Sequence, residues 1–460
     1  MSQATDVFVD KNSERFLDEL KSLIRIPSVS TLPDHAGDVR KAATFVADAL
    51  RAAGMENVEV IETAGHPLVY ADWLHAAGKP TVLCYGHYDV QPPDPLDEWI
   101  SPPFEPTVRN GNLYARGSAD DKGQMYSQIK AVETLRAAHG KLPINVKFLI
   151  EGEEEVGGEA ISKYVPEHRE KLKADVALVC DTELFAEGLP TLCVGLRGLI
   201  YTEIEARGPA KDLHSGMYGG AAPNAVFGLV ELLAKLKNAD GVIQIPGIYD
   251  DVEPPAPAEM KSWRALPFSE EEFLKSEVGS SRLTGEPNYS VLERVWARPT
   301  LEVHGIAGGF TGAGAKTVIP AKAIAKVSMR MVPGQNPEKV VAAYKKFVAE
   351  NTPAGIQTEV RILSAGPAIS VNPDHHAIHV AAQAFADVLG KETVFIRSGG
   401  SIPIVGEFAE YLGIPSILMG FGLPDDGLHS PNEKYKLANY YAGIKTIAHF
   451  FEQYGEQSGK

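Results

Sequence analysis

Short apolar runs alternate with amphipathic segments over the first two hundred residues of the chain. Strands are predicted at 80–85, 144–150 and 176–180, because each run is short, apolar and rich in β-branched or aromatic residues. Between residues 38 and 53 the apolar side chains recur at helical spacing, and Gly54 follows as a helix cap. This alternation is typical of an α/β domain with a doubly wound sheet.

The pattern changes after Gly198. Strands and helices are then expected in the order β-α-β-β-α-β, which predicts an α+β ferredoxin-like sandwich. The segments concerned are 200–206, 224–237, 300–304, 321–331, 338–350 and 357–363. The proline- and acid-rich stretch 245–299 is interpreted as an elaborated loop with short helices.

The α/β pattern resumes with a helix at 376–389 and a strand at 415–419. We therefore predict one α/β domain, formed by residues 1–201 and 370–460, that is interrupted by an inserted α+β domain at 202–369. A chain of 460 residues is long for a single core, which agrees with two domains.

Charge and composition narrow the class of protein. With 60 acidic against 44 basic residues, a surface for nucleic acid or anionic membrane is not expected. No apolar run approaches the roughly 18 residues of a membrane span, and the first residues do not resemble a signal peptide. Cys84, Cys180 and Cys193 lie in apolar segments without disulfide-like spacing. We expect a cytoplasmic protein.

Candidate metal ligands follow the predicted strands. His87 comes after the first strand, the cluster 151–155 after the second and Asp181 after the third. The carboxyl ends of parallel strands meet at one edge of a sheet, where such side chains would lie together. A metal-binding imidazole needs an acceptor for its other ring nitrogen, and Asp89 stands two residues beyond His87. Alone, His-x-Asp is a weak signal.

Further carboxylates strengthen that signal. Asp120 and Asp121 lie in a glycine-bounded loop and could simply cap a helix, and the run 153–155 could be a solvated face. Like charges at strand ends nevertheless repel unless cations neutralise them. With His429, which follows the strand at 415–419, the set suits two zinc-like ions sharing a bridging carboxylate. A further carboxylate outside the ligand set would serve as general base toward a water between the ions.

Five motifs together resemble one enzyme family. The segments 86–92, 116–123, 151–158, 212–216 and 427–433 are similar to the di-zinc metallopeptidases that include carnosinases, cytosolic non-specific dipeptidases, aminoacylases and glutamate carboxypeptidases. The motifs occur in order over nearly the whole chain, and the carnosinase and non-specific dipeptidase branch matches best. The resemblance implies a metallopeptidase domain with an inserted lid and dimerisation domain.

The resemblance also implies a ligand set for two divalent ions, zinc first, with manganese or cobalt as alternatives. Glu183 competes with Asp181 for one position because some relatives use Glu there, but the spacing to 195–198 favours Asp181. The implied metal ligands are His87, Asp120 as the bridge, Glu155, Asp181 and His429.

Three residues are expected to act beside the ions. By resemblance, Glu154 is the general base, Asp89 orients His87, and the peptide between Asp120 and Asp121 is cis. His214 could be an ordinary core histidine, but the resemblance makes it a donor to the oxyanion in the partner subunit's site. A homodimer formed through the lid domain is therefore expected.

The remaining candidates concern the substrate. Arg330 could be a surface charge, whereas by resemblance it binds the substrate carboxylate, with Thr317, Gly400 and Ser401 as further contacts. The predicted function is a two-metal hydrolase that cleaves dipeptides with a free carboxylate. An N-acyl-amino-acid deacylase is the alternative enzyme. A non-catalytic metal-binding scaffold is disfavoured, because it would need no general base.

Overall fold

Two units, each built around its own β-sheet, make up residues 2–457, the part of the chain that the computed structural model describes. Unit 1 consists of Met1–Val194, Val371–Ile396 and Pro403–Lys460, and unit 2 of Gly195–Ser370 and Arg397–Ile402. The boundary predicted between residues 201 and 202 falls inside strand β9 (Gly198–Arg207), so the inserted unit begins earlier than the alternation at 200–206 indicated.

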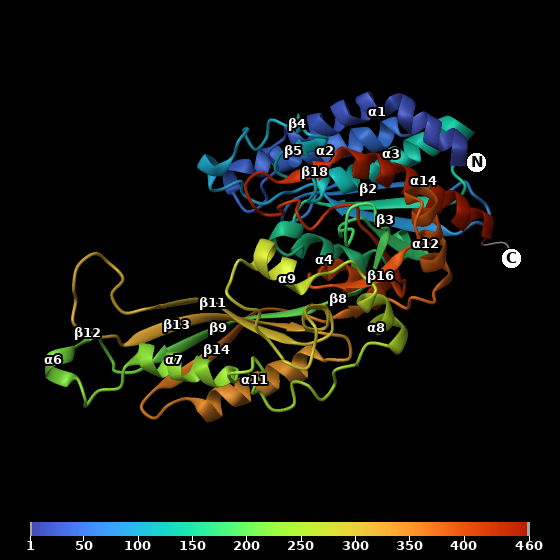
Figure 1. The fold of residues 1–460 in the computed structure, drawn as a ribbon. Helices are drawn as coiled ribbons and strands as arrows, with labels where there is room; N and C mark the ends of the chain where they lie inside the picture. The colour runs from blue at the N-terminus through green and yellow to red at the C-terminus, as the bar shows by residue number, and fades with distance from the viewer. Residues whose placement is uncertain (1, 458–460) are drawn as a thin grey trace. The chain divides into compact units, whose positions relative to one another are not determined.

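A mixed sheet forms the centre of unit 1 (Figure 1). Its four middle strands run parallel in the order β6-β3-β7-β17, while β1 and β2 on one side and β8 on the other are antiparallel to their neighbours. The bounds are β1 (Glu56–Ile61), β2 (Leu68–Trp73), β3 (Thr81–His87), β6 (Asn145–Glu151), β7 (Val176–Val179), β8 (Thr191–Leu196), β16 (Val394–Ser398), which pairs with β8, and β17 (Ser416–Met419). The predicted α/β class is confirmed, and the parallel strands are the ones that the apolar runs indicated.

Helix α3 (Lys122–His139) shows how this sheet is covered. Nearly every residue from Lys122 to Leu135 is buried, as expected for a helix enclosed on all sides. It packs on β3 and against helices α1 and α14 (Figure 1). The helices of unit 1 are α1 (Ser2–Ile24), α2 (Ala36–Ala52), α3, α4 (Glu159–Glu167), α5 (Arg169–Leu172), α12 (His376–Leu389), α13 (Pro403–Glu407) and α14 (Leu437–Gln457).

Shorter elements complete unit 1. A small three-stranded sheet joins β4 (Thr107–Arg109), β5 (Asn112–Tyr114) and β18 (Lys434–Lys436). Single turns of helix occur at η1 (Pro33–His35), η2 (Leu96–Glu98), η3 (Glu154–Val156) and η5 (Phe408–Leu412). Since η3 follows β6 directly, it presents the predicted base at the carboxyl end of the sheet.

Unit 2 has the predicted ferredoxin-like order. Its four antiparallel strands lie in the order β11-β13-β9-β14, and alternate residues of β9 and β13 form a core with helices α7 and α11, which cover one face (Figure 1). Asn224 caps α7 by accepting from the N–H groups of Val226 and Phe227. The main elements are β9, α7 (Ala225–Leu236), β11 (Thr300–Gly308), β13 (Lys322–Met331), α11 (Pro337–Asn351) and β14 (Gln357–Gly366).

The long connections of unit 2 contain only short elements, as predicted for 245–299. These are β10 (Leu213–His214), α6 (Ser215–Tyr218), α8 (Pro257–Arg264), α9 (Glu270–Glu272), η4 (Phe273–Val278), α10 (Val291–Trp296), β12 (Val318–Ile319) and β15 (Ile369–Ser370). Within residues 2–457, no helix combines the length and apolar character that crossing a bilayer requires. All three cysteines are buried.

Candidate metal centre

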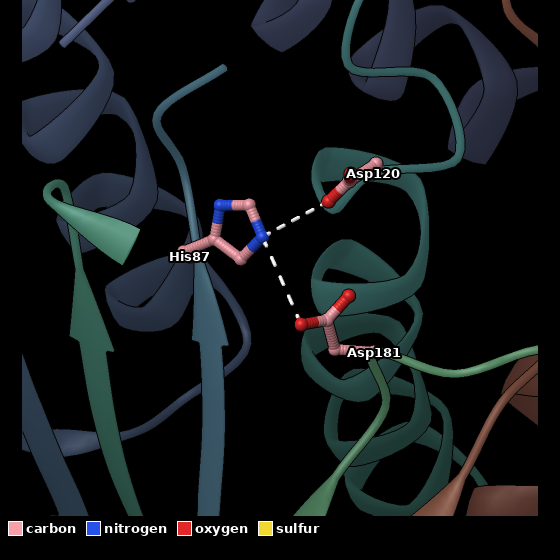
Figure 2. Close-up of side chains that lie close together, drawn as sticks. All are labelled: His87, Asp120 and Asp181. Carbon is pink, nitrogen blue, oxygen red and sulfur yellow. Dashed lines mark hydrogen bonds and ion pairs between the residues drawn. The ribbon is translucent and has the colours of Figure 1, made fainter. Parts of the chain in front are cut away.

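His87 ends β3 as a completely buried side chain. Its Nδ1 lies 3.1 Å from the backbone carbonyl oxygen of Asp89 and 3.4 Å from the carboxylate Oδ1 of the same residue. Its Nε2 faces Asp120 Oδ1 at 3.1 Å and Asp181 Oδ2 at 4.0 Å (Figure 2). The predicted neighbour Asp89 therefore holds one ring nitrogen chiefly through its carbonyl group, and Nε2 is directed at the carboxylates.

Asp120 lies at the centre of the cluster, in the loop that precedes α3. Its Oδ1 faces His87 Nε2, and its Oδ2 lies 3.0 Å from His429 Nε2, so each oxygen is directed at a different histidine. Burial alone would raise the pKa of Asp120, but hydrogen bonds from both histidines hold it below its usual value. The peptide between Asp120 and Asp121 is cis, as the resemblance implied.

Glu155 and His429 form the other side of the cluster. Glu155 Oε2 lies 3.4 Å from His429 Nε2 and accepts a hydrogen bond of 2.7 Å from Gln91 Nε2. Its Oε1 is buried and has no hydrogen-bond partner among the described residues. Burial raises the pKa of Glu155 to about 8, and the carboxylate of Asp120 adds to the rise.

The arrangement suits divalent cations. Two groups, His87 with Asp120 and Asp181, and Asp120 with Glu155 and His429, each bring one possible ligand atom per residue within 4.8 Å of the others. Burial holds the pKa of Asp181 well above its usual value, with nearby carboxylates adding to the effect. A cation would satisfy the orphaned Glu155 oxygen and relieve this repulsion. Glu183 belongs to neither group.

Glu154 follows the cluster on η3, where the carboxylate of Asp89 holds its backbone. Asp89 Oδ1 accepts from the N–H of Glu154 at 3.3 Å, and Oδ2 accepts from the N–H of Glu155 at 3.1 Å and from Ser30 Oγ at 2.7 Å. Burial raises the pKa of Glu154, His87 opposes the rise, and Asp120 and Asp89 increase it. Asp89 thus positions both His87 and the turn that carries Glu154 and Glu155.

Glu433 joins the loop of His429 to the loop of Asp120. It is fully buried, and its carboxylate accepts from Arg116 Nη1 at 2.7 Å and from the N–H groups of Gly117, Ala119 and Asp120 at 2.9, 2.9 and 3.1 Å. In its own loop, His429 has a φ of 59°, a left-handed conformation that is uncommon for a residue with a side chain. Glu433 therefore fixes the backbone of two ligand-bearing segments at once.

Unit 2 contains the remaining candidates. His214 and Thr317 are neighbours: His214 pairs with Val318 between β10 and β12, and Ser215 N donates to the carbonyl oxygen of Thr317 at 3.1 Å. Both candidate residues are exposed.

Arg330 and Ser401 lie together in the same unit. Arg330 Nη1 donates to Ser401 Oγ at 2.9 Å, and Gly400 is exposed beside Ser401. Residues 397–402 thus belong with the inserted unit, although the sequence placed them in the second part of the α/β domain.

Three residues of the site were given no contact with the metal ligands by the sequence analysis: Gln91, Asp121 and Glu433. Asp121 Oδ2 accepts from the N–H of His87 at 3.1 Å, and burial holds the pKa of Asp121 well above its usual value. All three residues lie inside the quoted motifs, but their tasks depend on partners distant in sequence.

A family comparison agrees with this geometry. Residues 83–453 match the model of peptidase family M20/M25/M40, and that range includes both candidate metal groups. The chain belongs to this family. The predicted peptide-bond hydrolase class and the resemblance to metallopeptidases are therefore confirmed, and family membership implies divalent metal ions.

Relatives in the family match over nearly their whole length. The Cys-Gly metallodipeptidase of Candida albicans is 33% identical over 97% of this chain and 96% of its own. The Beta-Ala-His dipeptidase of Homo sapiens is 33% identical over 96% of this chain and 91% of its own. The structure of human carnosine dipeptidase 1 superposes with a TM-score of 0.87 at 31% identity, covering 99% of both chains.

Replacing Glu433 should weaken metal binding. In Glu433→Gln an amide N–H₂ would replace one of the two acceptor oxygens and face N–H donors, so the loop of Asp120 would lose part of its hydrogen bonding and the two loops would move apart. We expect a ~10–100-fold loss of zinc affinity, as for other residues that orient metal ligands. Competition with a chromophoric chelator measures this affinity.

The matched control is Glu452→Gln. Glu452 is also buried, and it accepts from Thr5 Oγ1 at 3.0 Å and pairs with His139 Nε2 at 2.8 Å. His139 ends α3, roughly 25 Å from Asp121 at the other end of that helix. This variant should lose stability but keep zinc affinity. Equal affinity in both variants would contradict the role of Glu433.

When the metal is removed, the stability of the protein should depend on pH through the buried carboxyl group of Glu155. The pKa of Glu155 lies at about 8 in the fold against an ordinary 4.5, so its protonated form contributes stability at low pH that is lost as pH rises through about 8. The melting temperature of chelated protein should fall relative to chelated Glu155→Gln between pH 5 and 8. Parallel curves for the two proteins would show that Glu155 is not a buried acid.

Proposed function

We propose that the chain is a dipeptidase that holds two divalent ions between the histidines and carboxylates of the cluster. Zinc is the metal that we favour. His87 and Asp181 would hold one ion, Glu155 and His429 the other, and Asp120 would bridge them. The support is geometric: each oxygen of Asp120 is directed at a different histidine, at 3.1 and 3.0 Å. This one observation carries the proposal, because a bridging carboxylate has no use in a site for a single ion.

Glu154 is the proposed general base. When bound, the two ions would polarise the substrate carbonyl and make a water molecule more acidic. Glu154 accepts the proton of that water as it attacks the carbonyl carbon, and then donates it to the leaving amine nitrogen. The backbone N–H of Glu154 is fixed by Asp89, which leaves its carboxylate for proton transfer.

His214 is the proposed donor to the oxyanion. The N–H of Gly216 donates to His214 Nδ1 at 3.1 Å, which assigns the proton of a neutral ring to Nε2. Nε2–H is therefore available as a donor on an exposed side chain. A donor placed where negative charge develops stabilises the transition state.

Substrate binding is proposed for unit 2. Arg330 would bind the terminal carboxylate of the dipeptide, and Thr317, Gly400 and Ser401 would contact the same molecule. The Ser401 hydroxyl already accepts from Arg330 Nη1, so it would hold the guanidinium in place for a carboxylate.

A homodimer formed through unit 2 is part of the proposal. Strand β11 is at the edge of its sheet, and Val303 and Ile306 on it are 40% and 51% exposed. On α7, Phe227 is 69% exposed and Val230 46% exposed. An apolar edge strand beside an apolar helix face suits a second copy of the same chain, which would cover both.

Dipeptides fit better than the alternatives. The relatives named above are dipeptidases, which favours a dipeptide over an N-acyl amino acid as the substrate. A scaffold without activity is disfavoured because the proposed base and all five proposed ligands are present. We also propose a reducing compartment such as the cytoplasm, since Cys84 and Cys180 are buried free thiols.

Glu154→Gln should keep its metal and lose its turnover. The amide cannot accept a proton, so kcat for dipeptides should fall ~10²–10⁴-fold, while zinc content stays at the level of the wild type. Metal analysis of the purified protein and release of amino acids measure the two quantities. The exposed Glu159, which pairs with Lys163 in the same region, gives the control Glu159→Gln with unchanged turnover. Loss of zinc from Glu154→Gln would mean that Glu154 is a ligand.

Mixed dimers should reveal whether His214 acts across the interface. His214→Ala and Glu154→Gln homodimers should both be nearly inactive. A heterodimer of the two contains one site with an intact base and the partner subunit's imidazole, so it should regain about half of the wild-type activity per dimer.

Differently tagged chains, copurified, give the heterodimer for this assay. His75→Ala, which replaces an exposed histidine of unit 1, is the matched control and should leave homodimers active. An inactive but verified heterodimer would show that His214 does not serve the other subunit.

A further inference from the structure

Two guanidinium groups, those of Arg197 and Arg330, lie near each other in unit 2, and neither forms an ion pair with a carboxylate of the described residues. Arg197 lies between β8 and β9, and Arg330 is near the end of β13. Burial lowers the pKa of both, and for Arg197 the charge of Arg330 lowers it further, to about 10. The carboxylate that opposes this shift, Glu302, is itself paired with Lys237 at 2.8 Å. Among the described residues, no carboxylate oxygen lies within 4.0 Å of a guanidinium nitrogen of Arg197 or Arg330.

Other charges on the same strands are paired. Glu203 on β9 binds Lys326 at 2.9 Å and Arg361 at 3.3 Å, and Glu205 pairs with Lys322. The sheet therefore has a ladder of alternating charges that ends at two arginines of like charge. Such a pair is destabilised unless an anion from outside the chain joins it.

Arg197 is tied to the segment that carries the proposed substrate contacts. Its N–H donates to the Gly400 carbonyl oxygen at 3.1 Å, and its Nε donates to that of Gly399 at 3.3 Å. The Ser401 hydroxyl donates to the Arg197 carbonyl oxygen and accepts from Arg330 Nη1. One hydroxyl group thus links the two arginines.

The register of β11 and β13 brings the side chains of Arg197 and Arg330 to the same end of the sheet. Thr300 on β11 is the register partner of Arg330 on β13. Arg197 Nη1 approaches Thr300 Oγ1 at 3.4 Å, a long contact that leaves most of its donors for another acceptor. Both guanidinium groups therefore lie at the same end of the sheet, beside Ser401.

We propose that Arg197 joins Arg330 in binding the terminal carboxylate of the dipeptide, as a second and specificity-determining arginine. The inference rests on the proposed function and names the group that the substrate must carry. Two planar guanidinium groups can bind the two oxygens of a carboxylate through charge-assisted hydrogen bonds. A substrate with a neutral terminus would leave the arginines in mutual repulsion, so the corner would select for free acids.

The test compares alanyl-alanine with alanyl-alaninamide. The wild type should prefer the free acid. In Arg197→Gln, kcat/KM for the free acid should fall ~10–100-fold, mainly through KM, while the value for the amide changes little. Arg197→Lys keeps the positive charge but loses the planar guanidinium group, so its preference for the free acid over the amide should be intermediate. It also serves if Arg197→Gln does not fold.

The control is Arg397→Gln. Arg397 lies next to the same segment, but it is paired with Glu259 through contacts of 3.0 and 2.9 Å. Its loss should lower the rates for both substrates alike and keep the preference. If Arg197→Gln also lowers both rates alike, Arg197 only supports the segment and the inference is overturned.

A failure of the proposed function would look different, because the wild type would then cleave neither compound. Calorimetric binding of alanyl-alanine and its amide to the wild type and Arg197→Gln decides the inference in that case. Loss of the preference for the free acid in the variant supports the two-arginine site, and an unchanged preference overturns it.

Discussion

Repulsion among buried carboxylates is the constraint on which unit 1 depends. Asp120, Asp121, Asp181, Glu154 and Glu155 converge at the carboxyl edge of one sheet. Burial raises the pKa of each, and in Asp120 the two histidines outweigh that effect. Among residues 2–457, the imidazoles of His87 and His429 face Asp120 directly. Divalent cations would neutralise this repulsion, and the two oxygens of Asp120 are directed at different histidines.

Carboxylates outside the ligand set keep this strained arrangement in place through backbone hydrogen bonds. Asp89 accepts from the N–H groups of Glu154 and Glu155, and Glu433 accepts from those of three residues in the loop before α3. The situation in unit 2 has the opposite sign, because Arg197 and Arg330 form no ion pair with a carboxylate of the described residues and the charge of Arg330 lowers the pKa of Arg197.

Local pattern was enough to predict most of the fold. Apolar runs such as 80–85 became β3, the helical spacing at 224–237 became α7, and the order of elements predicted the ferredoxin-like sheet. His87 ends β3 and Asp181 follows β7, and both could be predicted as candidate ligands because the carboxyl edge of a parallel sheet gathers such residues. Glu433 was missed as a positioning residue, because its acceptor role depends on donors more than 300 residues away. Arg197 was missed because no sequence pattern indicates that an arginine will lack an ion pair with the described carboxylates.

The most direct test of the account is release of amino acids from alanyl-alanine and from N-acetyl-alanine by the wild-type protein, before chelation, after it and after zinc is restored. The account predicts that the dipeptide is cleaved much faster, that chelation stops the reaction, and that zinc restores it. Cleavage of the acetyl compound alone would make the chain a deacylase, and dipeptide cleavage that survives complete chelation would contradict the metal centre described here.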